Sequence, residues 1–130
     1  VSQEAFDENC AIIEEELKHY HELYDIYNSY EGVNNLYYLN REAGKAPVEV
    51  DEDIIALFEF GREIYDLTGG KTNYAMGSVL KIWHEYREAG NFDYFSAEVP
   101  PMDMLKEASQ HCDINDVIID KENSTVFLWK

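Results

Sequence analysis

The stretch LTGGKTNYAMGSVLKIWHEYREAG, residues 67–90, decides the fold because it joins two apolar-periodic segments through a glycine-rich elbow, residues 69–73. Gly69 and Gly70 end the first periodic segment, and the second begins near Ala75. Two successive glycines are typical of a helix end, where the chain turns in a left-handed conformation. The stretch predicts a helix, a sharp turn and a second helix. The elbow is either a plain capped turn or a place where free backbone amides meet a ligand.

The segments on both sides of the elbow have apolar residues at helical spacing. We expect a helix over 52–67 with Asp51 as its N-cap, and a second helix over 75–89 that ends before Gly90. The residues expected to face the core are Ile54, Leu57, Phe58, Gly61, Ile64 and Tyr65 in the first helix, and Val79, Ile82, Trp83 and Tyr86 in the second.

Two further helices and a pair of strands complete the expected fold. A helix is predicted over residues 3–27, a short element ends at Gly44, and another helix runs from Pro101 to Cys112. The apolar face of the first helix is Phe6, Cys10, Ile13, Leu17, Tyr20, Tyr24 and Tyr27. Residues 116–120 and 125–129, DVIID and TVFLW, are typical of a β-hairpin.

These elements predict an α+β fold: one helix-rich lobe over residues 1–130, with about four helices and a terminal β-hairpin. A hairpin without further strands is marginally stable in water. We therefore expect the lobe to be a fragment of a larger fold.

The charge of the chain excludes several classes of partner. With 27 acidic and 10 basic residues, the formal net charge is −17, and no cluster of Lys or Arg occurs. Nucleic acids and anionic membrane surfaces are bound through cationic contacts, so neither is an expected partner. A phosphorylated ligand would need backbone amides, a helix N-terminus or a metal ion.

No catalytic or metal-binding motif is present. Cys10 and Cys112 lie at apolar-periodic positions, which favours buried core residues, with a long-range disulfide as the alternative. His19 and His21 point to different sides of a helix and cannot hold one metal ion together. The chain has no HExxH or phosphate-loop motif and no apolar run of about 18 residues. We expect neither catalytic residues nor metal ligands in it.

Several landmark residues lie in YEGVNNLYYLN, residues 30–40, and in residues 48–83, and a helix and strand pair follows over residues 100–128. The landmarks are Tyr30, Leu39, Asn40, Thr68, Gly69, Gly70, Gly77 and Trp83. Together these features resemble the ApbE family of FAD:protein FMN transferases. The family's alanine–apolar–aspartate triplet is replaced here by Lys71, Thr72 and Asn73.

The resemblance implies a function and a partial site. FMN would pass from FAD to a threonine of a target protein with Mg²⁺, and Tyr30, Lys71, Thr72 and Asn73 would contact FAD. The resemblance places the Mg²⁺ ligands and the catalytic half outside this fragment, which would be inactive alone. It also implies an extracytoplasmic lipoprotein, anchored through a lipid outside the fragment. The alternative is a non-catalytic, acidic helical interaction domain of an exported protein.

Overall fold

The computed structural model describes residues 2–129, which form two compact units. Within that range, unit 1 comprises residues 2–57 and 119–128, and unit 2 comprises residues 58–118 with Trp129. The expectation of a single lobe over residues 1–130 stays a prediction.

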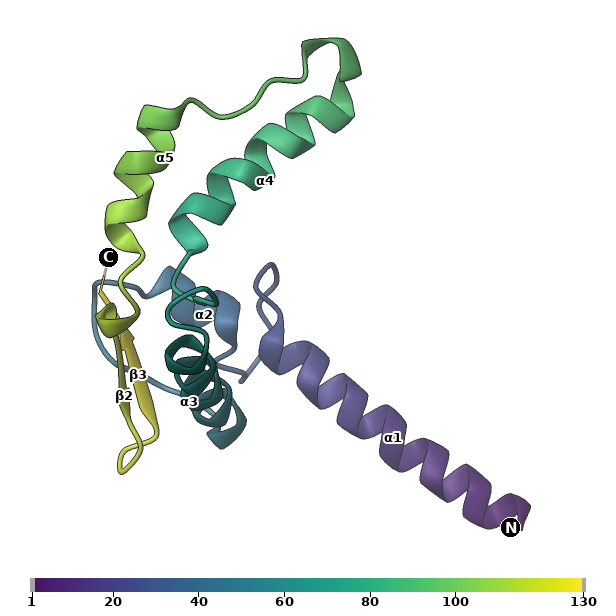
Figure 1. Ribbon diagram of the computed structural model, residues 1–130. Helices are drawn as coiled ribbons and strands as arrows, with labels where there is room; N and C mark the ends of the chain where they lie inside the picture. Colours follow the sequence, from purple (N-terminus) through teal and green to yellow (C-terminus); the bar gives the residue numbers. More distant parts are fainter. Residues whose placement is uncertain (1, 130) are drawn as a thin grey trace. The chain divides into compact units, whose positions relative to one another are not determined.

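The chain is helix-rich with a small sheet, as Figure 1 shows, and the predicted α+β class is confirmed. Its elements are α1 (Gln3–Tyr24), α2 (Leu36–Arg41), β1 (Val48–Glu49), α3 (Glu52–Leu67), α4 (Gly77–Phe92), α5 (Met102–Ala108), β2 (Val117–Asp120) and β3 (Thr125–Leu128). Short 3₁₀ turns lie at Tyr94–Ser96, Ser109–His111 and Ile114–Asp116.

The sheet contains the predicted hairpin and one strand that the sequence did not indicate. Its strand order is β1-β3-β2, and β1 pairs antiparallel with β3 so that Val48 lies opposite Val126. β1 has two residues, which is too short to show an alternating pattern. This third strand gives the hairpin the additional pairing that two strands alone lack.

The core of unit 1 forms where the end of α1, α2, β1, the start of α3 and β3 each contribute apolar side chains. Its buried apolar residues are Leu23, Leu39, Val48, Val50, Ile54, Ile55 and Val126. In unit 2 the buried apolar residues are Phe58, Ile114 and Val117.

Helix α1 is confirmed, but most of its apolar face is not buried in the core. Phe6 is 57% exposed and Leu17 is 67% exposed, and Leu23, absent from the predicted face, is the buried residue of the helix. The helix ends at Tyr24 rather than Tyr27 because the chain becomes extended at Asp25. Among the described residues, the core of unit 1 reaches only the last turns of α1.

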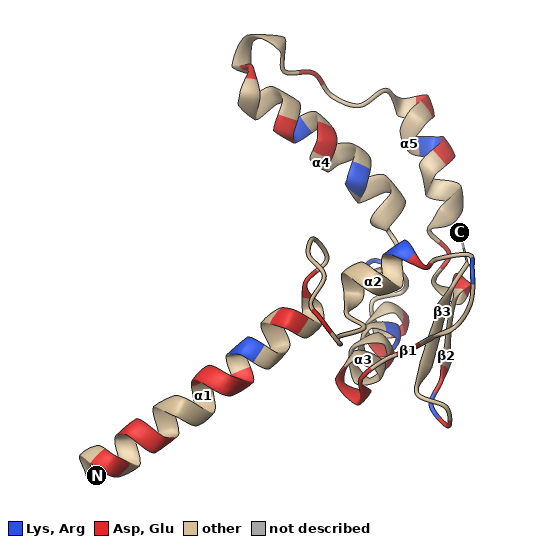
Figure 2. Cartoon of the chain, turned by 180° about the vertical axis from the view of Figure 1, so that it is seen from behind, with Lys and Arg blue, Asp and Glu red and all other residues tan. Residues whose placement is uncertain are grey.

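Acidic residues recur along the length of α1, whose ribbon is coloured red at these positions in Figure 2. The helix carries one lysine, Lys18, and seven acidic residues: Glu4, Asp7, Glu8, Glu14, Glu15, Glu16 and Glu22. None of the helices in the described part of the chain is both long and apolar enough to cross a membrane.

Cys10 is exposed on α1 and Cys112 is half-buried, and both are free thiols. The prediction of two buried core cysteines is therefore wrong for Cys10, because the face of α1 that carries it is uncovered.

The helices beside the elbow are confirmed with one change of boundary. Helix α3 has the predicted bounds, and the carboxylate of Asp51 accepts the N–H of Asp53 at 2.9 Å, as an N-cap does. Helix α4 continues through Gly90 to Phe92. A Cβ at Gly90 would lie 3.1 Å from the Cβ of Ala97, so this glycine serves close packing instead of ending the helix.

Exposure also corrects part of the predicted core on these two helices. Leu57 is 38% exposed and Trp83 is 45% exposed. The other predicted residues of α4, Val79, Ile82 and Tyr86, are half-buried.

The polar side chain of Asn35 is fully buried in unit 1, with 0% exposure. Its Nδ2 donates to the carbonyl oxygens of Glu22 at 3.0 Å and Asn28 at 2.8 Å. Its Oδ1 accepts the N–H of Tyr38 at 3.0 Å and so caps α2. One amide therefore joins the end of α1, the following loop and the start of α2.

Replacing Asn35 by alanine is expected to destabilise the protein strongly. Asn35→Ala leaves two carbonyls and one N–H without their partner in a buried place, which costs about 2–4 kcal/mol. The neighbouring Asn34 is exposed and donates once, to the carbonyl of Glu49, so Asn34→Ala should cost less than about 1 kcal/mol. Urea unfolding of both variants measures this difference. Equal decreases in the free energy of unfolding for Asn35→Ala and Asn34→Ala would contradict the role of Asn35.

Candidate functional site

Tyr30, the predicted flavin contact in unit 1, lies half-buried on the loop between α1 and α2. Its hydroxyl donates to Oδ2 of Asp25 at 2.8 Å and lies 3.2 Å from Nε2 of His21. Its ring meets the His21 ring edge-on, with centroids 6.1 Å apart. Its backbone carbonyl accepts the N–H of Val33, which closes a tight turn at Gly32. Both the ring and the backbone of Tyr30 are therefore held in place.

Asp25 organises the loop that carries Tyr30. Its carboxylate accepts the side-chain amide of Asn28, the backbone N–H groups of Tyr27 and Asn28, and the hydroxyl of Tyr30. These hydrogen bonds, the one from the Asn28 side chain foremost, hold the pKa of Asp25 far below its usual value. The hydrogen bond to Asp25 in turn raises the pKa of Tyr30, because loss of the proton would break it.

The elbow in unit 2 is a complete helix cap. The N–H of Gly70 donates to the carbonyl of Tyr65 at 2.8 Å, and the N–H of Gly69 donates to that of Asp66 at 3.1 Å. Both glycines have positive φ, +62° and +80°. This is the Schellman arrangement, and it explains both glycines by turn chemistry alone.

The three other residues of the elbow lie in different surroundings. Lys71 and Thr72 are exposed, whereas Asn73 is half-buried. The side chain of Asn73 donates to the carbonyl of Cys112 at 2.8 Å and accepts the N–H of Ala75 at 2.8 Å. Asn73 thus fixes the elbow against the segment that follows α5.

The free backbone amides that the ligand-binding alternative for the elbow requires are only partly present. The amides of Gly69 and Gly70 complete the cap of α3, and that of Thr72 donates to the hydroxyl of Thr68 at 3.2 Å. The amide of Ala75 is bound by Asn73. These groups stabilise the turn, so a ligand would meet mainly the side chains of Lys71 and Thr72.

Tyr74 anchors the elbow in unit 2, although nothing in the sequence singled it out. Its ring packs edge-on against Phe58, with centroids 5.1 Å apart, and it lies so close to Gly61 that a Cβ there would collide with it. Burial raises the pKa of Tyr74, and the nearby Arg62 guanidinium opposes this shift. Gly61, one of the residues expected to face the core, provides the space for this ring.

Arg62 joins the elbow's helix to the last part of unit 2. Its guanidinium donates to the carbonyl of Val117 at 2.6 Å and to that of Ile114 at 3.3 Å. A charged group that is bound to backbone carbonyls holds irregular backbone in place, here the turn before β2.

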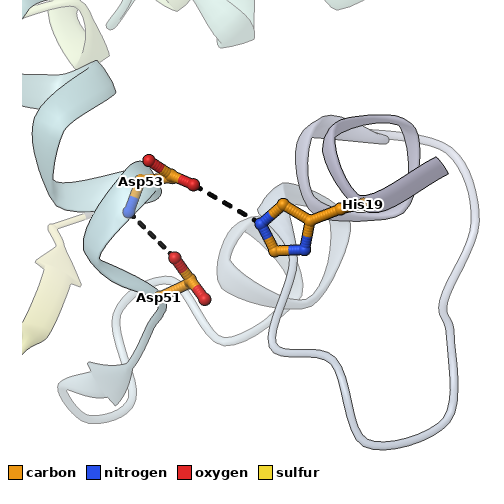
Figure 3. Close-up of side chains that lie close together, drawn as sticks. All are labelled: His19, Asp51 and Asp53. Carbon is orange, nitrogen blue, oxygen red and sulfur yellow. Dashed lines mark hydrogen bonds and ion pairs between the residues drawn. The ribbon is translucent and has the colours of Figure 1, made fainter. Parts of the chain in front are cut away.

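A cluster of possible metal ligands lies in unit 1, apart from the predicted residues. His19, Asp51 and Asp53 each offer an atom within 4.8 Å of the others (Figure 3). Asp51 and Asp53 lie 32 and 34 positions after His19 along the chain, so no sequence motif marks the three residues. The sequence indicated Asp51 only as a helix cap, and His19 only as a residue that cannot share a metal ion with His21.

The loop at Tyr30 belongs to unit 1 and the elbow belongs to unit 2. In unit 1 the structure brings Tyr30 together with Asp25 and His21. In unit 2 it fixes Asn73 within the elbow and leaves Lys71 and Thr72 on the surface.

The network around Asp25 predicts a change in acid stability. A carboxylate whose pKa is lowered by folding stabilises the protein above its unfolded pKa, about 3.9, and loses this effect as pH falls toward its folded value. Asp25→Asn should therefore be less stable than the natural protein at neutral pH. The difference in free energy of unfolding between the natural protein and Asp25→Asn should narrow steadily below about pH 4.

Denaturant unfolding between about pH 2 and 7 measures the gap. Glu31→Gln, at an exposed position on the same loop, is the matched control. A gap for Asp25→Asn that stays constant with pH would contradict the network.

Comparison with known proteins identifies the family of the chain. The sequence model of the ApbE family matches residues 1–130. Over 79 residues the chain is 39% identical to an FAD:protein FMN transferase from Treponema pallidum (strain Nichols). That alignment covers 61% of this chain and 20% of the relative.

A solved structure agrees with the fold. The crystal structure of the ApbE protein from Thermotoga maritima matches with a TM-score of 0.69 and 22% identity. The match covers 100% of this chain and 38% of the Thermotoga chain, so the chain spans well under half the length of either relative. Together with the match of the family model over the whole length, these findings show that the chain belongs to the ApbE family.

Proposed function

We propose that the chain is part of a flavin transferase that moves FMN from FAD onto a threonine of a target protein. The observation that carries the proposal is the 39% identity to the Treponema FAD:protein FMN transferase over 79 residues. The partners in this proposal are FAD and the protein that receives FMN.

Tyr30 contributes an aromatic surface to FAD. The hydrogen bond to Asp25 and the contact with His21 restrain its ring before any ligand arrives. A restrained ring loses little conformational freedom when a flavin packs on it, so more of the stacking energy contributes to affinity.

The elbow contributes polar contacts to FAD. Lys71 and Thr72 are exposed, and a lysine ammonium attracts the anionic or carbonyl groups of the cofactor. The side-chain amide of Asn73 is bound to Cys112 and Ala75, so its contribution is the shape of the elbow. All three residues therefore belong to the proposed FAD contact, in different ways.

The proposed reaction is a phosphoryl transfer. A threonine hydroxyl forms a phosphoester with FMN, the pyrophosphate bond of FAD breaks, and AMP leaves. Mg²⁺ neutralises charge on the transferring group in reactions of this class.

The described residues of this chain do not form a cluster that fits Mg²⁺. The cluster of ligand type in the described range includes the His19 imidazole, whereas Mg²⁺ is bound by oxygen atoms. The proposal therefore assigns the Mg²⁺ ligands and the catalytic groups to other parts of the protein, and residues 1–130 alone are inactive.

The proposal also includes a location outside the cytoplasm and a lipid anchor, which rest on the resemblance to ApbE lipoproteins. A second candidate function is an acidic helical interaction domain. The exposed apolar face of α1 favours it, since Phe6, Ile13 and Leu17 are each more than half exposed on a strongly acidic helix.

Flavin binding by the full-length protein tests the proposal. Tyr30→Ala should weaken FAD binding by about 1–3 kcal/mol, or roughly 5- to 150-fold in Kd, the range of aromatic stacking on bases. Tyr27→Ala, on the same loop at a residue that is 66% exposed, is the matched control and should leave the Kd within about twofold. Quenching of flavin fluorescence measures both values.

Covalent transfer is followed in the same preparation. FAD and Mg²⁺ are added together with an extract of the source cells, and protein-bound flavin fluorescence is read after denaturation. A labelled target band that requires the full-length protein supports the proposal. Failure to bind FAD, together with capture of a protein through α1, would replace it with the second candidate.

A further inference from the structure

The cluster of His19, Asp51 and Asp53 brings together three side chains of metal-ligand type, one from α1, one from the N-cap of α3 and one from the first turn of α3. Nε2 of His19, near the end of α1, lies 3.4 Å from Oδ2 of Asp53, the second residue of α3 (Figure 3). Ligand atoms on neighbouring positions around a first-row metal ion lie about 3 Å apart, given bond lengths of about 2.0–2.2 Å. The 3.4 Å between His19 and Asp53 is close to this spacing, and all three ligand atoms lie within 4.8 Å of one another, so binding an ion requires the three side chains to move closer together.

Backbone contacts fix both aspartates before any ion binds. Oδ1 of Asp51 accepts the N–H of Asp53 at 2.9 Å, and this helix cap sets the direction of the carboxylate. The hydroxyl of Tyr24 donates to the backbone carbonyl of Asp53 at 3.3 Å, which ties this turn to α1 one turn after His19. A site whose ligands are already ordered loses less entropy on binding.

The surroundings carry enough negative charge to attract a cation. A hollow beside the cluster is lined by His19 and Asp51 together with Glu22, Glu49 and Asn34. Its described lining includes no lysine or arginine, although Lys18 pairs with Glu22 at 3.8 Å. The amino end of α3 adds a partial positive charge of about half a unit, which four carboxylates near the site outweigh.

The nature of the ligands selects the class of ion. Imidazole nitrogen suits zinc and its neighbours in the first transition row, whereas Mg²⁺ and Ca²⁺ prefer oxygen atoms alone. One imidazole and two carboxylates make three protein ligands and leave further positions to water. The cluster is therefore suited to a divalent transition metal.

We propose that His19, Asp51 and Asp53 form a binding site for a divalent transition metal ion of the zinc type. The bound ion joins α1 to the start of α3. Most of α1 is exposed, and its buried residue is Leu23, so a metal link at His19 adds an attachment one turn earlier. The site does not depend on the flavin chemistry, and either proposal can fail without the other.

Without an ion, the same contacts amount to a helix cap and an exposed ion pair. The side chains of His19 and Asp53 are 44% and 41% exposed, and exposed pairs contribute little to stability. A metal site predicts that the stability of the protein depends strongly and selectively on a transition metal, whereas a cap and an ion pair predict no such dependence. The experiment below distinguishes these two cases.

Metal titration of the full-length protein tests the site. Co²⁺ is added in the presence of millimolar Mg²⁺, so that oxygen-only sites are occupied, and its visible absorption reports nitrogen and oxygen ligation. Zn²⁺ is then used to displace Co²⁺ and to measure affinity and melting temperature. We expect one Co²⁺ per chain at this site, displacement by Zn²⁺, and a higher melting temperature with Zn²⁺.

Matched variants locate the ion. His19→Ala and Asp53→Asn should each weaken Zn²⁺ binding by about tenfold or more, since even indirect partners of metal ligands matter by 10- to 100-fold. His21→Ala removes a histidine from another side of the same helix, and Glu15→Gln removes one exposed negative charge from it. Both controls should bind Zn²⁺ as the natural protein does.

Two results would overturn the site. One is the absence of Co²⁺ and Zn²⁺ binding by the folded protein. The other is Zn²⁺ binding that His19→Ala and His21→Ala weaken equally. In that case the ion would be attracted by the acidic surface in general and would not be held by the cluster.

Discussion

Three segments of unit 1 meet at the buried side chain of Asn35, whose amide bonds to the carbonyls of Glu22 and Asn28 and to the N–H of Tyr38. The chain reverses between α1 and α2 over a loop that has few apolar residues to bury. Its backbone groups must find partners inside the protein, because buried and unpaired polar groups are costly. Asn35 supplies three of those partners, and the carboxylate of Asp25 binds the backbone of Tyr27 and Asn28 and the hydroxyl of Tyr30. The position of Tyr30 follows from these two side chains.

In unit 2, the backbone of the elbow is stabilised by two glycines and by a packed aromatic ring. The Schellman cap at Gly69 and Gly70 ends α3, and Tyr74 packs beside Gly61 while Asn73 bonds to Cys112. The turn is therefore complete without a ligand. What it offers to a cofactor is a fixed platform with Lys71 and Thr72 on its surface.

Local signals explain why much of the fold could be predicted from the sequence. The Asp51 cap and the double glycine mark both ends of α3, and helix boundaries that depend on such caps are readable in one sequence. Burial is different, since it depends on what lies opposite each face. Phe6 and Leu17 have the spacing of core residues yet are exposed. Gly90 is a residue type that often ends a helix, yet it lies within α4. In the same way, His19 meets Asp53 only through the fold, so the cluster has no signature in the chain.

The central claim is that the loop at Tyr30 and the elbow are flavin-contact surfaces of an ApbE transferase. Hydrogen exchange of the full-length protein, with and without FAD and Mg²⁺, tests it most directly, because it reports each segment separately. The account predicts that FAD slows exchange in residues 27–33 and in residues 71–74, while α4 beyond its first turn is unaffected. Saturating FAD that leaves both segments unchanged would contradict the account.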